Sequence, residues 1–227
     1  MKIRLVCATR LSQEVFFEKA ALGQSYKLYK PAMGALEIFI FPENTSGLPD
    51  IYNQAIEHAA TDPAILIFIH DDVHLSDFYW GKHLTSALNL FDIVGVAGNK
   101  RRNPKQASWY FLNDAYLRDD VQYLSGVVGH GKGFPADDLS VYGEPGQECK
   151  LLDGLLIAVK SETLIKNELR FDPQFDFHFY DIDFCRQAEL KGLKMGTCHV
   201  SLIHESGGDF NEAWRQMYQK YLTKYGE

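Results

Sequence analysis

Cysteine is scarce in this chain of 227 residues. The four thiols are Cys7, Cys149, Cys185 and Cys198, and no two of them form a C-x-x-C pair. A disulfide framework is uncommon in a chain of this length with so few cysteines, and their spacing matches no zinc pattern. We therefore expect four buried, reduced thiols, which indicates a protein of a reducing compartment such as the cytoplasm.

Long hydrophobic runs are also missing. The N-terminal sequence MKIRLVCATR has one short apolar run and lacks the longer apolar core of a signal peptide. No stretch approaches the roughly 20 apolar residues of a membrane span. The pattern predicts a soluble cytoplasmic protein, and it leaves open a peripheral contact with a membrane surface.

An excess of positive charge is absent as well. Lys and Arg total 23 against 30 for Asp and Glu, which gives a net charge of −7. This balance argues against a protein that coats nucleic acid. A short basic group, made of Lys100, Arg101, Arg102 and Lys105, favours a solvated loop over a site for an acidic lipid or a diphosphate.

What the first half contains is an alternation of strand and helix signals. The predicted strands are Ile3–Ala8, Glu37–Phe41, Ala64–Ile69 and Ile93–Ala97, and the predicted helices are 12–22 with Ser12 as N-cap, Leu48–Ala60, and Ser76–Leu90 with Ser76 as N-cap. This order predicts an α/β fold in which helices flank a mostly parallel, Rossmann-like central sheet.

The pattern changes in the second half. Residues 99–150 are rich in Gly, Pro, Asp and Lys, which predicts a long irregular segment with short strands at Ser108–Leu112 and Gln122–Val128. The later predicted elements are a strand within Lys150–Val159, helices at 161–168 and 180–191, a strand at 194–199, and a C-terminal helix within 209–227, at Asn211–Tyr225. We expect one domain over residues 1–227.

The Gly-rich segment Gly126–Gly133 lacks the Gly-Lys-Ser/Thr of a phosphate-binding P-loop, so a P-loop is excluded. We interpret the segment as a mobile flap over a site.

Ligand-type residues follow a buried strand directly at Phe68–Val73. His70, Asp71 and Asp72 come at its carboxyl end, where open α/β sheets bind their ligands. In an extended chain residues 70 and 72 point to one side and Asp71 to the other. A carboxylate here can hold Mg²⁺ or Mn²⁺ together with substrate phosphates. The other interpretation is a polar turn that closes the strand.

Two later clusters could also carry chemistry. Asp181 and Asp183 fall in the first turn of a predicted helix, where the helix dipole favours acids. Apolar Ile182 and Phe184 put Asp181 near buried surface, where a carboxylate can deprotonate a hydroxyl. His204 follows another apolar run, and an imidazole beside carboxylate oxygens suits Mn²⁺ better than Ca²⁺.

Taken in order, these motifs resemble glycosyltransferase family 2 on a GT-A fold, and most of all its subgroup with a His-x-Asp metal motif. The resemblance covers roughly residues 2–205. The segments that carry it are Glu43–Leu48, Tyr52–Ala55, His70–Val73, Leu152–Val159, Tyr180–Arg186 and His204.

The resemblance implies a role for each site residue. Asp72 would hold a divalent metal, Mn²⁺ or Mg²⁺, with His204 and with His70, which stands at the position of the family's first aspartate. Asp181 would be the general base, and Tyr180 replaces the Glu that precedes it in the family. The implied donor-binding residues are Thr9, Arg10, Asn44, Asn53, Asp71, Asp153 and Gly154.

We expect five acids to converge on one cleft around the cation: Asp71, Asp72, Asp153, Asp181 and Asp183. The irregular segment 99–150 would form the acceptor side, with Trp109 as its best candidate for stacking on a sugar.

The implied function is a metal-dependent, inverting transfer of a sugar from a UDP- or GDP-linked donor to a hydroxyl of a carbohydrate or lipid-linked acceptor, in surface glycan synthesis and without nucleic acid as a partner. Two other hypotheses stay open. One is a non-catalytic module that binds nucleotide sugars or carbohydrates. The other is a nucleotidyltransferase-type enzyme, although the Gly-rich loop with a basic residue expected after its first strand is absent.

Overall fold

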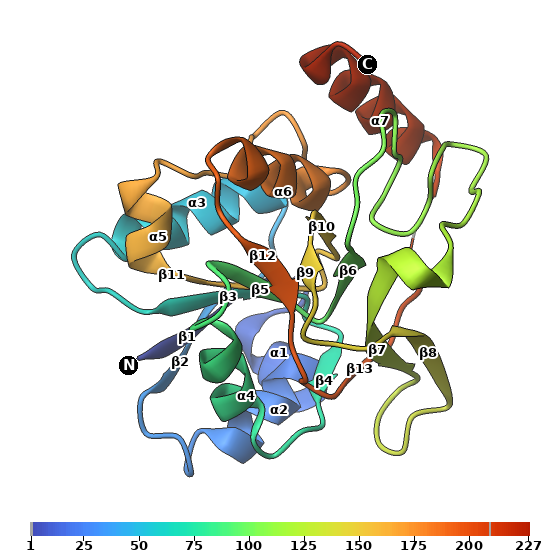
Figure 1. Cartoon of the computed structure of the whole chain (residues 1–227). Coiled ribbons are helices and arrows are strands. Elements are labelled where there is room, and N and C mark those ends of the chain that lie inside the picture. The colour runs from blue at the N-terminus through green and yellow to red at the C-terminus, as the bar shows by residue number, and fades with distance from the viewer. Residues whose placement is uncertain (1, 209) are drawn as a thin grey trace.

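The computed structural model of the chain describes residues 2–208 and 210–227. Its strands form two sheets that share one hydrophobic core (Figure 1). The first sheet has, in spatial order, β2 (Leu36–Phe41), β1 (Ile3–Ala8), β3 (Ile65–Ile69), β11 (Leu156–Lys160), β5 (Ile93–Gly95), β12 (Met195–Thr197) and β9 (Glu148–Cys149). The second has β10 (Leu151–Leu152), β6 (Ala97–Asn99), β7 (Leu124–His130), β13 (Leu202–His204) and β4 (Val73–Leu75), with β8 (Asp138–Gly143) paired to β7.

The three N-terminal strands confirm the predicted Rossmann-like arrangement. Strand β1 pairs in parallel with both β2 and β3. All five residues of β3 are buried, because helices cover both faces of this part of the sheet. Strand β11 then enters antiparallel between β3 and β5, so the sheet as a whole is mixed.

Helices cover the two faces of the first sheet. They are α1 (Gln13–Lys19), α2 (Ala21–Tyr29), α3 (Leu48–His58), α4 (Trp80–Ala87), α5 (Ser161–Lys166) and α6 (Tyr180–Leu190). The C-terminal helix α7 (Glu212–Tyr225) packs against α6, and a 3₁₀ turn lies at Val121–Tyr123. Figure 1 shows α3, α5 and α6 on one side and α4, α1 and α2 on the other. No helix of the described residues is both long and apolar enough to cross a bilayer.

Two predicted helices have different bounds. The helix expected at 12–22 is divided, because Ala20 is extended and serves both as C-cap of α1 and as N-cap of α2. Ser12 caps α1 as predicted, accepting from the Val15 amide. The prediction for Ser76 was wrong: its amide donates to the Ser201 carbonyl, and α4 begins only at Trp80.

The strand predicted at Ile93–Ala97 belongs to two sheets. Strand β5 pairs with β11 and β12 of the first sheet, and after Val96 the chain continues as β6 in the second. Gly126 of β7 lies against this crossing with φ of 113°, and a Cβ there would be 2.0 Å from the Val96 carbonyl oxygen. Only glycine therefore allows the two strands to approach so closely.

The segment 99–150 is more regular than predicted, since it supplies β7, β8 and β9. The flap predicted at Gly126–Gly133 was wrong, because most of this segment is β7, hydrogen-bonded to β6, β8 and β13. The strand expected at Ser108–Leu112 is reduced to one bridge between Phe111 and Arg118.

Two of the four basic residues of this segment are paired with acids within the fold. Arg101 forms an ion pair with the buried Asp119 and stacks on Tyr123. Arg102 donates to a Glu189 carboxylate oxygen at 3.0 Å. These two cations therefore hold the loop to the body of the protein.

Candidate metal and catalytic site

The predicted site residues lie where the chain passes between the two sheets. His70, Asp71 and Asp72 connect β3 of the first sheet with β4 of the second. Asp153 and Gly154 connect β10 of the second sheet with β11 of the first. His204 ends β13, which pairs with β4. Three segments that are far apart in sequence thus meet at the carboxyl edge of β3, the edge at which α/β folds bind ligands.

Three of the predicted residues form a compact set of metal-ligand atoms. One atom each from His70, Asp72 and His204 lies within 4.8 Å of the others, and all three side chains are partly buried. His204 Nε2 is 3.3 Å from Asp72 Oδ1. Two imidazoles and one carboxylate fit a divalent first-row transition ion such as Mn²⁺ better than Ca²⁺, which prefers oxygen alone. The chemistry of this donor set therefore fits the expected cation.

The three side chains of this group shift one another's pKa values. Burial alone would raise the pKa of Asp72, but the hydrogen bond and the charge of His204 lower it well below its usual value. Burial would lower the pKa of His204, and Asp72 raises it above the ordinary value. Burial, together with the charge of His204, lowers the pKa of His70. Near neutral pH the group therefore offers an ionised carboxylate and a neutral His70 imidazole.

Asp181 lies in the first turn of α6 and is held by backbone amides. Its Oδ2 accepts from the Gly154 amide at 3.0 Å, and its Oδ1 accepts from the Ile182 amide at 2.9 Å. Burial raises its pKa to about 7, with a further contribution from the negative charge of Asp153, and these outweigh the backbone hydrogen bonds. A carboxylate with this pKa can accept a proton near neutral pH.

A tyrosine links Asp181 to the metal-ligand group. Tyr180 Oη is 3.0 Å from His70 Nε2 and also 3.0 Å from the Gly154 carbonyl oxygen. The amide of the same residue, Gly154, binds Asp181, so Gly154 contacts both the tyrosine and the candidate base. The candidate base and the candidate ligands therefore belong to one site.

The predicted donor-binding residues separate into two groups. Thr9 follows β1, and its hydroxyl donates to Asp71 Oδ2 at 2.5 Å, which brings both residues to the same sheet edge. Asp153 accepts from the Leu155 amide, and its charge acts on His70, His204 and Asp181. These three residues and Gly154 surround the candidate ligands.

The other three predicted donor-binding residues make different contacts. The Asn53 amide group donates to the Phe171 carbonyl and accepts from the Phe171 amide, so it fixes that loop. Asn44 closes a local turn with Ser46. Arg10 is exposed next to Thr9. The structure brings neither asparagine side chain to the metal-ligand group.

The expectation that Asp183 faces the cleft was wrong. Asp183 is fully buried against α7, where Lys224 Nζ lies 2.5 Å and Tyr225 Oη 2.7 Å from its Oδ1. Position 183 is two residues from 181 and thus projects about 200° around the helix. Trp109 is also buried, with its ring 4.7 Å from that of Tyr142, so it does not offer a free face to a sugar.

Sequence reasoning missed one residue of the site. Phe177 lies in the bent loop that precedes α6, is 53% exposed, and stacks on His70 with an angle of 24° between the rings. The signal in the sequence was the aromatic-rich run FDFHFY, but its spacing does not tell which of these rings is exposed. Only the fold shows that this ring covers His70.

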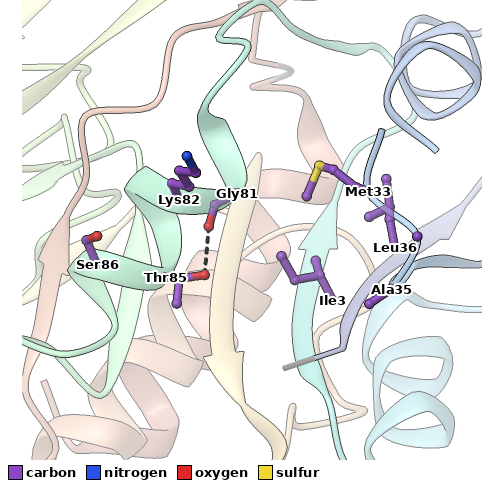
Figure 2. A pocket seen from close by; sticks show the side chains of 9 residues that line it. Ile3, Met33, Ala35, Leu36, Gly81, Lys82, Thr85 and Ser86 are labelled. Carbon is purple, nitrogen blue, oxygen red and sulfur yellow. Dashed lines mark hydrogen bonds between the residues drawn. The ribbon is translucent and has the colours of Figure 1, made fainter. Parts of the chain in front are cut away.

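A separate cavity of about 570 Å³ lies at the opposite edge of the first sheet. Its lining includes Ile3 and Leu36, the first residues of β1 and β2, together with Met33 and Lys82 (Figure 2). The predicted site follows the last residues of these parallel strands. The cavity shares no residue with the site, and its lining is mostly apolar.

Known structures share this architecture. The catalytic domain of Drosophila beta1,4galactosyltransferase 7, solved with xylobiose, aligns with a TM-score of 0.50 and 12% identity over 96% of this chain and 79% of its own. GalNAc-T7 with UDP, GalNAc and Mn²⁺ aligns with a TM-score of 0.56 and 10% identity over 98% of this chain and 48% of its own. A197 from STIV has a TM-score of 0.50 and 14% identity over 92% and 96%. No curated protein matches the sequence closely enough to count as a relative.

These likenesses define the class of the fold as the GT-A fold of glycosyltransferases. The sequence profile of a glycosyltransferase-like family matches residues 6–225, nearly the whole chain. The chain belongs to this family and is a glycosyltransferase.

Proposed function

We propose that this glycosyltransferase moves a sugar from a nucleotide-linked donor to a hydroxyl of a carbohydrate acceptor, with inversion at the anomeric carbon and with a divalent cation at His70, Asp72 and His204. The observation that carries the proposal is that Tyr180 and Gly154 bring the candidate ligands and Asp181 together at one edge of the sheet. The GalNAc-T7 structure of the same fold contains UDP, GalNAc and Mn²⁺, which supports a nucleotide sugar and a metal. The galactosyltransferase with xylobiose supports a carbohydrate acceptor.

Asp181 supplies the base of this reaction. As the acceptor oxygen attacks the anomeric carbon, its proton passes to a carboxylate oxygen of Asp181. The bond between the anomeric carbon and the diphosphate oxygen breaks in the same displacement, so the configuration inverts. The cation, when bound, stabilises the negative charge of the leaving diphosphate.

The remaining residues bind and orient the substrates. Asp71, held by the Thr9 hydroxyl, and Asp153 lie beside the ligands, where their carboxylates can accept hydrogen bonds from donor hydroxyls. Arg10 is the exposed cation that follows Thr9, and it can approach the nucleotide end of the donor. A UDP- or GDP-linked donor, a role in surface glycan synthesis and a cytoplasmic location complete the proposal. A lipid-linked acceptor reached through a peripheral membrane contact is part of the same proposal.

The variant Asp181→Asn tests the catalytic part. We expect sugar transfer to fall by about 10²- to 10⁴-fold, because asparagine cannot accept the acceptor proton. Donor binding, measured by calorimetry with Mn²⁺ present, is expected to be retained. Transfer at the wild-type rate would remove Asp181 from the mechanism.

The matched control is Glu162→Gln. Glu162 is the second residue of α5, as Asp181 is of α6, and both are acids in a first helical turn. Glu162 is exposed and lies outside the site, so this variant should transfer sugar at the wild-type rate.

A further inference from the structure

The hydroxyl of Tyr180 has one hydrogen, and two of its hydrogen-bond partners decide where that hydrogen lies. The partners are His70 Nε2 and the Gly154 carbonyl oxygen, each at 3.0 Å. A carbonyl oxygen can only accept, so the tyrosine hydrogen points to Gly154. The bond to His70 can then form only if His70 Nε2 carries a hydrogen and donates it to the tyrosine oxygen.

This arrangement determines the tautomer of His70. A neutral imidazole has one N–H, and with that hydrogen on Nε2 the lone pair is on Nδ1. Ligating histidines usually donate their other ring N–H to an acceptor, which fixes the ring and raises its basicity as a ligand. Tyr180 is the acceptor of this kind in the present site.

We propose that Tyr180 is a positioning residue that holds His70 as the Nε2–H tautomer and so presents Nδ1 to the divalent cation. The inference rests on the metal site of the proposed function and deepens it, since it names the ligating atom and the residue that selects it.

The position of the tyrosine is itself tightly fixed. Its ring packs against Tyr52 and Phe171, with centroids 5.8 and 6.1 Å away. A Cβ at position 154 would be 2.3 Å from Tyr180 Oη, so Gly154 is the residue that admits the hydroxyl. The tyrosine oxygen therefore has little freedom to leave its two partners.

The same contacts explain why tyrosine can stand where family 2 has a glutamate. A carboxylate at this position would accept from His70 but could not donate to the Gly154 carbonyl. The phenol does both, and the Gly154 amide in turn donates to Asp181 Oδ2. Tyr180 thereby contacts one metal ligand and Gly154, the residue whose amide holds the base.

The test is the affinity for Mn²⁺ of the purified protein without any donor. We expect Tyr180→Phe to weaken Mn²⁺ binding by about 10- to 100-fold, measured from the electron paramagnetic resonance signal of free Mn²⁺. The matched control is Tyr29→Phe, which also removes a hydroxyl from a buried tyrosine, here one that donates to the Leu75 carbonyl at 3.0 Å. It should bind Mn²⁺ like the wild type.

A second measurement reads the tautomer directly. Long-range ¹H–¹⁵N spectra of the metal-free protein should show His70 as the Nε2–H form in the wild type and as a mixture in Tyr180→Phe. Unchanged Mn²⁺ affinity in Tyr180→Phe, or a wild-type His70 with its hydrogen on Nδ1, would overturn the inference alone. Failure of the wild-type protein to bind Mn²⁺ would overturn the proposed metal site as well.

Discussion

Two aspartates of this glycosyltransferase show how strongly surroundings decide the behaviour of one side chain. Asp72 lies beside His204, and its pKa is well below the ordinary carboxyl value even though burial acts in the other direction. Burial of Asp181, together with the negative charge of the nearby Asp153, raises its pKa to about 7. The first acid stays charged and suits a cation, whereas the second can gain and lose a proton near neutral pH.

The pKa of Asp181 is raised although several of its contacts act in the opposite direction. Asp181 has two backbone amide donors and a helix N-terminus, features that normally lower a carboxyl pKa. Burial and the charge of Asp153 outweigh them. A helix position alone is therefore a poor guide to the protonation of an acid.

The largest effect that separates the two acids should be on metal binding. We expect Asp72→Asn to weaken Mn²⁺ binding by on the order of 100-fold, because it removes a charged ligand. Asp181→Asn should weaken Mn²⁺ binding much less, because Asp181 lies outside the ligand group and acts on the cation only through its charge. Titration of both variants with Mn²⁺ decides this. Equal losses in the two variants would show that the acids share one role.

The next effect is on the pH dependence of transfer at saturating Mn²⁺. The rate should fall about tenfold per pH unit below the pKa of Asp181, because only the ionised carboxylate accepts a proton. Burial, with a contribution from the charge of Asp153, raises this pKa to about 7, well above the ordinary carboxyl value, and the positive charge of a bound cation would lower it toward that ordinary value.

The variant Asp153→Asn sharpens this measurement. It removes the negative charge that helps to raise the pKa of Asp181, and an asparagine oxygen can still accept from the Leu155 amide. The acid limb of the pH–rate profile should therefore move to lower pH. A limb that stays in place would mean that another group controls the rate.

The smallest effect should come from Phe177. Its exposed ring stacks on His70, and we expect it to contact the transferred or the accepting sugar. Phe177→Ala should raise KM for one substrate by about 3- to 10-fold, the equivalent of one aromatic contact. Phe78→Ala, which removes a ring that is 78% exposed two residues before α4, serves as control. Equal KM values in the two variants would place Phe177 outside the binding site.

The sequence was sufficient for the strands and helices with strong apolar periodicity, such as β3 and α3. It also identified the residues of the candidate metal group, because ligand-type side chains follow buried strands. It could not reveal that Ile93–Asn99 is divided between two sheets, since the division at Val96 depends on distant partners. The contact of Asp183 with Lys224 is likewise invisible to local spacing, because a helix has several faces and α7 covers one of them.

The two histidines of the candidate metal group come from different sheets. His70 stands at the end of a strand in one sheet, and His204 ends a strand in the other. The spacing of the two imidazoles therefore depends on how the two sheets are placed relative to each other. A cation held by both imidazoles would link the sheets at the point where the chain passes between them.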